Sequence, residues 1–144
     1  LAAARSGFNN PDQHVILPEV LSKEPLAPLA AGGDQRLADA MRWVIYALIA
    51  AEELGITQEN IGNKLAEAQS RPQLTQLRRF LGVEADLGQK LGLNNDFIVK
   101  VIQAVGNYGE IYDRHLGPKS AVPIPRGLNN LYSNGGILTS PPFQ

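Results

Sequence analysis

The 144-residue sequence contains no cysteine, and aromatic residues make up only 6% of it. The absence of cysteine excludes disulfide bonds, thiolate metal sites and cysteine nucleophiles among these residues. It does not determine the compartment, because many proteins of oxidising compartments also lack cysteine.

Neither sign of charge is in excess, since 13 Lys and Arg face 14 Asp and Glu, for a formal net charge of −1. Without a basic excess, we expect no attraction to nucleic acid or to an anionic membrane surface. Long hydrophobic runs are also lacking: the longest, residues 43–51, has about half of the ~20 residues that span a bilayer. No signal peptide is recognisable in the sequence.

Motifs for catalysis and phosphate binding are missing as well. The sequence has no Gly-x-Ser-x-Gly nucleophile elbow, no Gly-x-x-x-x-Gly-Lys-Ser/Thr phosphate loop and no Gly-x-Gly-x-x-Gly. Its two histidines, His14 and His115, are far apart, and neither has a second ligand at metal-binding spacing. We therefore predict no catalytic residue, no metal ligand and no cofactor.

Two clusters of acidic residues could be interpreted as catalytic or metal-binding sites. Glu110 and Asp113 lie near His115, but a solvated charged helix end is a better interpretation than a metal or acid–base cluster. Glu52 and Glu53 are adjacent, so their side chains diverge by about 100° on a helix. A solvated helix edge is again favoured over catalysis.

Basic and aromatic residues allow similar alternatives. Arg78 and Arg79 could contact an anion, but we expect an exposed pair without a specific partner. Trp43 and Tyr46 lie within an apolar stretch, which favours core packing over ligand stacking. Tyr108 stands between two glycines, as in a ligand platform, although a helix junction that the ring plugs is favoured.

The composition that is present, 44% hydrophobic and 19% charged, is typical of one globular domain with a core. A helix over residues 35–54 is the clearest element, because Asp34 can cap it. Two apolar rows run along this helix: Leu37, Met41, Val44, Leu48 and Ala51, and Trp43, Ala47, Ala50 and Leu54. A helix apolar on both sides needs a substantial partner, which these residues hardly supply.

The remaining chain predicts short elements. Residues 1–6 are typical of a helix tail, and the β-branched run 14–17 favours a buried strand. Glycines and caps predict further helices over about 57–65, 70–81, 87–91, 95–105 and 108–112, an extended segment over 117–125 and a last helix over 126–132. The chain begins at Leu1 without a cap or an initiator Met, so we expect it to start within a longer protein.

Several ordered stretches carry a resemblance to a known family. They are His14-Val-Ile-Leu-Pro-Glu-Val20 with Ser22-Lys-Glu-Pro-Leu26, Gly33-Asp34, Arg42-Trp-Val-Ile-Tyr-Ala-Leu48, Ala51-Glu-Glu-Leu-Gly-Ile-Thr57, Leu81-Gly-Val-Glu84 with Leu87-Gly88, Val105-Gly-Asn-Tyr-Gly-Glu-Ile-Tyr112, and Arg126-Gly-Leu-Asn129 with Gly135-Gly136 before Pro141-Pro142. Together they resemble the C-terminal part of the periplasmic substrate-binding proteins of general L-amino-acid ABC transporters, in the type II, or family 3, group.

The resemblance implies an α/β parent fold with two lobes joined by a hinge, of which this chain is the mainly helical C-terminal part with about two short strands. Residues 1–13 would end the second lobe, residues 14–25 would form a hinge-crossing strand, and residues 26–144 would complete the first lobe and add a helical C-terminal extension.

The same resemblance implies a periplasmic protein that captures polar and general L-amino acids. Its partners would be the free amino acid, the permease subunits of the ABC transporter and the missing N-terminal part of the same protein, with no nucleic acid. The family's main ligand-binding positions lie upstream of Leu1, so the ligand-binding residues of this chain are unknown.

Two alternatives stay open. The chain could be a self-contained helical interaction module without ligand-binding activity. It could also belong to an enzyme on the same two-lobe fold that resembles cyclohexadienyl dehydratase, although the sequence favours a protein that is not an enzyme.

Overall fold

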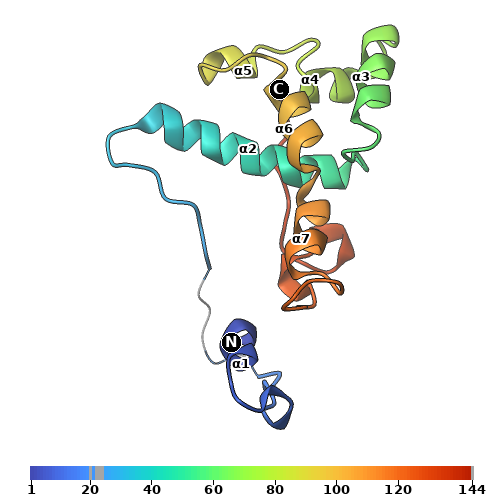
Figure 1. The fold of residues 1–144 in the computed structure, drawn as a ribbon. Coiled ribbons are helices and arrows are strands. Elements are labelled where there is room, and N and C mark those ends of the chain that lie inside the picture. The colour runs from blue at the N-terminus through green and yellow to red at the C-terminus, as the bar shows by residue number, and fades with distance from the viewer. Residues whose placement is uncertain (20, 22–24, 144) are drawn as a thin grey trace.

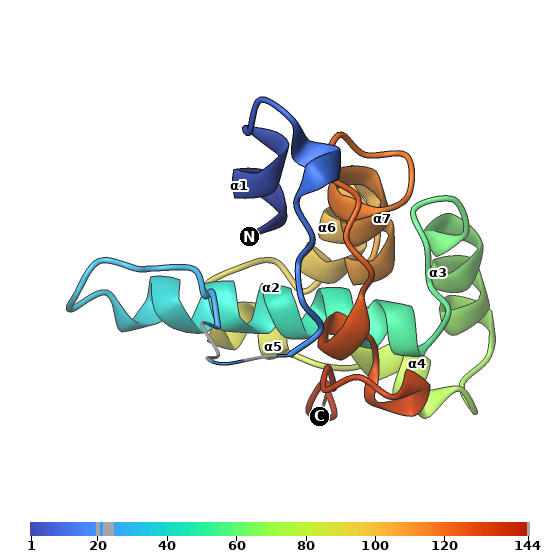
Figure 2. The ribbon, with the colours of Figure 1, turned by 90° about the horizontal axis from the view of Figure 1, so that it is seen from below.

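The computed structural model of the chain describes residues 1–19, 21 and 25–143 (Figure 1). A helical body contains the elements from α2 onward, and the short helix α1 (Ala2–Ser6) lies apart from it at the N-terminal end. A 3₁₀ helix, Pro11–Gln13, follows α1. Seen from below in Figure 2, this N-terminal segment lies beside the loop after α7, and residues of α1 line one hollow with Val122.

The long helix α2 (Gln35–Glu53) runs through the body and confirms the helix predicted over residues 35–54. Its start is set locally, because the Asp34 carboxylate accepts a hydrogen bond from the backbone N–H of Leu37 at 2.9 Å. Only the C-terminal half of α2 is buried, through Ala47, Ala50 and their neighbours. The N-terminal half projects from the body (Figure 1).

Short helices pack around the buried half of α2. They are α3 (Ile61–Ser70), α4 (Thr75–Phe80), α5 (Leu87–Lys90), α6 (Phe97–Val105) and α7 (Tyr108–Leu116). Helices α6 and α7 contact α2, while α3 contacts α4 and α6. Gly106, with a φ of 78°, makes the sharp turn between α6 and α7 that a residue with a side chain would rarely adopt.

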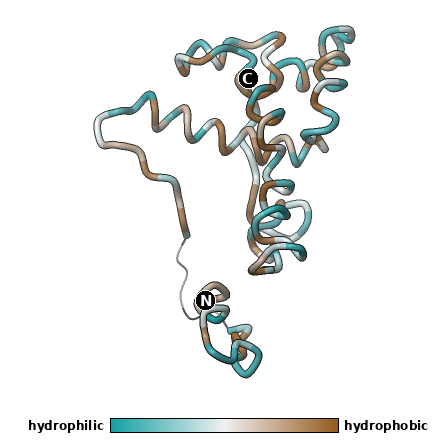
Figure 3. The backbone as a smooth tube through the Cα atoms, viewed as in Figure 1, coloured by the Kyte–Doolittle hydropathy of each residue, from teal (hydrophilic) through white to brown (hydrophobic). Residues whose placement is uncertain are grey.

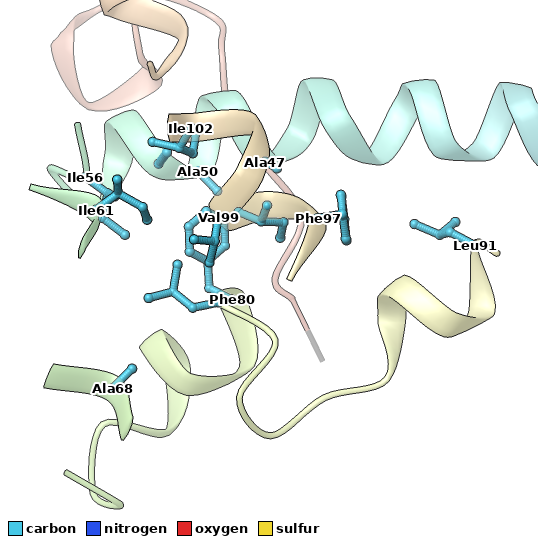
Figure 4. Packing of buried hydrophobic residues seen from close by; sticks show 13 residues of the cluster. Ala47, Ala50, Ile56, Ile61, Ala68, Phe80, Leu91, Phe97, Val99 and Ile102 are labelled. Carbon is cyan, nitrogen blue, oxygen red and sulfur yellow. The ribbon is translucent and has the colours of Figure 1, made fainter. Parts of the chain in front are cut away.

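The core lies between α2, α4 and α6 (Figure 4), where the labelled side chains of Phe80, Val99 and Ile102 point toward one another. Ile56 and Ile61 close it at the start of α3. Helix α6, predicted over about residues 95–105, contributes to this core. Phe97 and Ile102 are buried, whereas Val105 is exposed at the end of the helix.

The mainly helical character is confirmed, but the strands are not formed in the described part of the chain, which has only an isolated parallel bridge between Leu131 and Leu138. Residues 14–17 are extended and exposed, Val15 at 80%, rather than a buried strand. A strand needs hydrogen-bonding partners on a neighbouring strand, and no described residue supplies them. Residues 20 and 22–24 of the predicted hinge-crossing strand lie outside the described residues.

Two helix predictions also need correction. Ser70 was expected to open a helix through Leu81, but it is the last residue of α3, and α4 begins only at Thr75. The last helix, expected over residues 126–132, is replaced by two 3₁₀ helices, Gly127–Asn129 and Tyr132–Asn134. In this segment Leu131 is buried, whereas Leu128 is 55% exposed.

Among the helices that the structure describes, none combines the length and the apolar character that crossing a membrane requires.

Candidate functional site

Exposed large apolar side chains are concentrated in the N-terminal quarter of the described chain. We call this set the N-terminal apolar surface; it consists of the exposed side chains of Leu1, Phe8, Val15, Ile16, Leu17, Leu21, Leu26, Leu29 and Leu37. Figure 3 shows hydrophobic positions on the extended segment that leads to α2. Single exposed leucines are ordinary, but a concentration of exposed apolar side chains of this kind is typical of an interaction site.

Two hollows border this surface. The first, of about 370 Å³, is lined mainly by apolar side chains, among them Leu1, Phe8, Ile16 and Leu21. The second, of about 400 Å³, lies where Pro28 and its neighbours pass beside Met41 and Ile45 of α2. The surface therefore presents grooves in which apolar side chains of another segment can pack.

A polar cluster lies at the opposite end of α2. The guanidinium of Arg126 donates to both carboxylate oxygens of Glu52, through Nη1 to Oε1 and through Nη2 to Oε2 at 3.1 Å. The two side chains are only 18% and 15% exposed. Gly109 permits this approach, because a Cβ there would come within 2.9 Å of Glu52 Oε1. We call Glu52 and Arg126 the α2 ion pair.

Two tyrosines of α7 complete the environment of Arg126. Its guanidinium carbon lies 5.6 Å from the ring centroid of Tyr108 and 5.5 Å from that of Tyr112, which are cation–π distances. The Tyr112 hydroxyl contacts the carbonyl oxygens of Ile124 and Pro125, both at 3.3 Å. The α2 ion pair thus fastens the loop after α7 to the central helix.

Charge and burial shift the pKa values of this cluster. The hydrogen bond that Arg126 donates to Glu52 raises the pKa of Arg126 above its ordinary value, although burial opposes the rise. Burial raises the pKa of Tyr112 above 10.0, and the neighbouring Tyr108 adds to the effect while Arg126 opposes it. Both shifts keep the charged guanidinium beside a neutral phenol, which is the state that the cation–π contacts require.

Glu110 has a structural role, which corrects its interpretation as part of a solvated helix end. Its Oε2 accepts the backbone N–H of Asn107 at 2.8 Å, while Asn107 Oδ1 accepts that of Glu110 at 2.9 Å, so the two form a capping box at the start of α7. Asn107 is also 94% removed from solvent, at 6% exposure, and donates to the Ile56 carbonyl at 2.8 Å. Asp113 and His115 are exposed, as expected.

The predicted exposure of the other charged and aromatic residues is confirmed for some and wrong for others. Glu53 is exposed, but Glu52 is a half-buried ion-pair partner rather than part of a solvated edge. Arg79 is exposed, whereas Arg78 is mostly buried, donating to Glu84 at 2.9 Å and to the Ala68 carbonyl at 2.8 Å. Tyr108, the first residue of α7, is half-buried, and the guanidinium of Arg126 from the following loop lies over its ring.

Trp43 and His14 make separate aromatic contacts. Trp43 packs edge-on against Tyr46, with ring centroids 5.8 Å apart, which confirms packing within the body. His14 is exposed; one of its ring nitrogens, Nδ1, lies 2.9 Å from the carbonyl oxygen of Asn10, and its ring lies 4.7 Å from Phe8. Within the described ranges, no group of three or more acidic or histidine side chains is arranged to hold a metal.

Sequence reasoning missed the α2 ion pair. Its members are 74 residues apart, and neither residue type announces its partner. The only local signal was Gly109, a glycine inside a helical stretch, which often marks a close approach.

The chain resembles periplasmic binding proteins of ABC transporters in both structure and sequence. It matches a solved ABC transporter periplasmic binding protein from Brucella ovis with glutathione bound, with a TM-score of 0.86 and 43% identity over 99% of this chain and 44% of that one. The predicted parent fold is thereby confirmed. No protein-family model matches the chain.

Within that class, the relatives are amino-acid-binding proteins. The chain is 48% identical to the general L-amino acid-binding periplasmic protein AapJ of Rhizobium johnstonii and 44% identical to the glutamate/glutamine/aspartate/asparagine-binding protein BztA of Rhodobacter capsulatus. Each match covers 100% of this chain and 41% of the relative. The chain is thus similar over its whole length to periplasmic binding proteins of amino-acid ABC transporters, and it spans about two fifths of the length of these relatives.

Proposed function

We propose that the chain is the C-terminal part of a periplasmic protein that captures polar L-amino acids and delivers them to the permease subunits of an ABC importer. The observation that carries the proposal is the match over the whole chain, at 44% and 48% identity, to two amino-acid-binding proteins. The relatives are binding proteins rather than enzymes, so we propose binding without chemical turnover.

In this proposal residues 1–13 end the second lobe, residues 14–25 cross the hinge and residues 26–144 complete the first lobe. The position of α1 outside the helices that pack around α2 supports such a division (Figure 1). The amino acid closes the two lobes around itself, because it binds the closed state more tightly than the open one. The permease then recognises the closed protein.

The N-terminal apolar surface also supports this reading over a self-contained helical module. A self-contained module buries its apolar residues within itself, whereas Leu26, Leu29 and Leu37 are exposed here. We propose that the rest of the binding protein covers them. The residues of that other part of the protein, rather than those of this chain, make the main contacts with the amino acid.

Isothermal titration of the longer protein that contains this chain tests the proposal. We expect saturable binding of glutamate, glutamine, aspartate or asparagine at one site, with the D-isomers of the same amino acids as matched controls that bind more weakly. Glutathione belongs in the same series, because a solved relative holds it. No saturation with any of the twenty L-amino acids would contradict the proposal, and turnover of a cyclic dienyl acid would favour an enzyme instead.

A further inference from the structure

The last described residues of the chain return to the body and cross the gap between α2 and α4. The segment 140–143, Ser-Pro-Pro-Phe, lines a hollow of about 330 Å³ together with the end of α2 (Ala50, Glu53 and the following Leu54) and with Gln76 and Phe80 of α4. We call this segment the C-terminal strap. It is held on both sides by helices that are distant from it in sequence.

Phe143 is the anchor of the strap. Its ring centroid lies 5.1 Å from that of Trp43, with an interplanar angle of 71°, and 5.0 Å from that of Phe80, with an angle of 89°. Both are edge-to-face arrangements, which are the favourable geometry for aromatic pairs. One ring therefore joins α2 to α4, and Phe80, its partner on α4, is among the most buried residues of the core.

The composition of the strap suits this task. Pro141 and Pro142 have fixed φ angles, so the strap loses little conformational freedom when it is ordered. It makes few polar contacts with the body: its described hydrogen bond is local, from the Ser140 hydroxyl to the Pro141 carbonyl at 3.1 Å. Its attachment to α2 and α4 depends mainly on the ring of Phe143.

We propose that Phe143 acts as a tethered aromatic plug, which closes a slot between Trp43 and Phe80, and that the slot accepts a free aromatic ring when the plug is removed. Phe80 belongs to the core cluster and Trp43 packs against that cluster, so we expect the slot to persist without the strap. Apolar sites bind benzene-sized molecules where aromatic and aliphatic side chains line them, as Trp43 and Phe80 line this slot. The proposal is independent of amino-acid binding.

Phe143→Ala in the 144-residue chain tests the proposal, since Trp43 is the only tryptophan in the sequence and reports on the slot. We expect the variant to shift Trp43 emission to the red, to increase its quenching by acrylamide and to lower the melting temperature by about 5 °C. Saturating benzene should restore a large part of the melting temperature. Ile137→Ala is the matched control, because Ile137 lies nearby in the sequence and is 66% exposed.

Two results would overturn the proposal. One is a Phe143→Ala chain with the same emission and melting temperature as Ile137→Ala; the other is a melting temperature that falls without recovery in benzene. If Phe143→Ala does not fold, nuclear Overhauser contacts between Phe143 and Trp43 in the unaltered chain decide the matter, and their absence rejects the plug. Their presence, with partial loss of stability in Phe143→Leu, supports it.

Discussion

The guanidinium of Arg126 donates to the Glu52 carboxylate and lies near the rings of Tyr108 and Tyr112. These contacts determine how much the ion pair contributes to stability. A half-buried guanidinium and carboxylate lose hydration when they are brought together, so the pair itself contributes little net stability. Removing one member costs much more, because the other charge stays desolvated without a partner. Glu52 would be left in that state, since its side chain is only 15% exposed.

We predict that Arg126→Met lowers the free energy of unfolding by about 2 kcal/mol, through an unpaired Glu52 and the lost tyrosine contacts. Urea denaturation of the chain measures this change in the free energy of unfolding. Lys100→Met is the matched control, because Lys100 pairs with Asp96 at 3.0 Å on an exposed helix surface; its cost should stay below about 0.5 kcal/mol. Equal effects of the two substitutions would show that burial does not strengthen the α2 ion pair.

At the scale of the element, the start of α7 depends on Asn107 in two ways. Its side chain caps the helix through Glu110 and also ties α7 to the turn after α2 through the Ile56 carbonyl. A local cap and a long-range hydrogen bond thus share one amide. Because Asn107 is buried, its loss leaves both the helix terminus and the Ile56 carbonyl without a partner in a place that water reaches poorly.

Asn107→Ala should therefore lower the free energy of unfolding by about 2 kcal/mol, as the sum of a lost cap and an unsatisfied buried carbonyl. Asn63→Ala is a suitable comparison, since Asn63 is exposed within α3 and alanine is the better helix former. It should change stability by only a few tenths of a kcal/mol. Denaturation monitored by circular dichroism separates the two variants, and similar midpoints would contradict the role given to Asn107.

At the scale of the whole molecule, apolar side chains are buried in one part of the chain and exposed in another. The C-terminal half of α2 lies in a closed core, whereas its N-terminal half and the preceding segment expose leucines. The two apolar rows of α2 are continuous in the sequence, so the helix is built to be covered along its entire length. In isolation, the 144-residue chain should therefore cover this surface by association with a second copy.

We expect light scattering to find dimers or larger species of the 144-residue chain, in a concentration-dependent equilibrium. Leu37→Ser should weaken that association roughly fivefold, because it removes about 1 kcal/mol of apolar burial from the interface. Leu128→Ser, at a residue of similar exposure at the other end of the chain, should leave the association unchanged. If the unsubstituted 144-residue chain were monomeric, this result would instead support the self-contained helical module.

The sequence by itself determined what depends on neighbours within three or four residues. Asp34 as the cap of α2, the glycine that ends α6 and the mainly helical character follow from local caps and periodicity. The resemblance to amino-acid-binding proteins could also be recognised from the sequence, because short motifs and their order can be identified without knowing which residues they contact.

Only the tertiary structure decided which distant groups meet. The partnership of Glu52 with Arg126, the burial of Arg78 and the seating of Phe143 between Trp43 and Phe80 join residues whose types would suit many partners. It also decided that residues 14–17 form no strand in the described chain, because a strand is defined by hydrogen bonds to another segment and not by its own β-branched side chains.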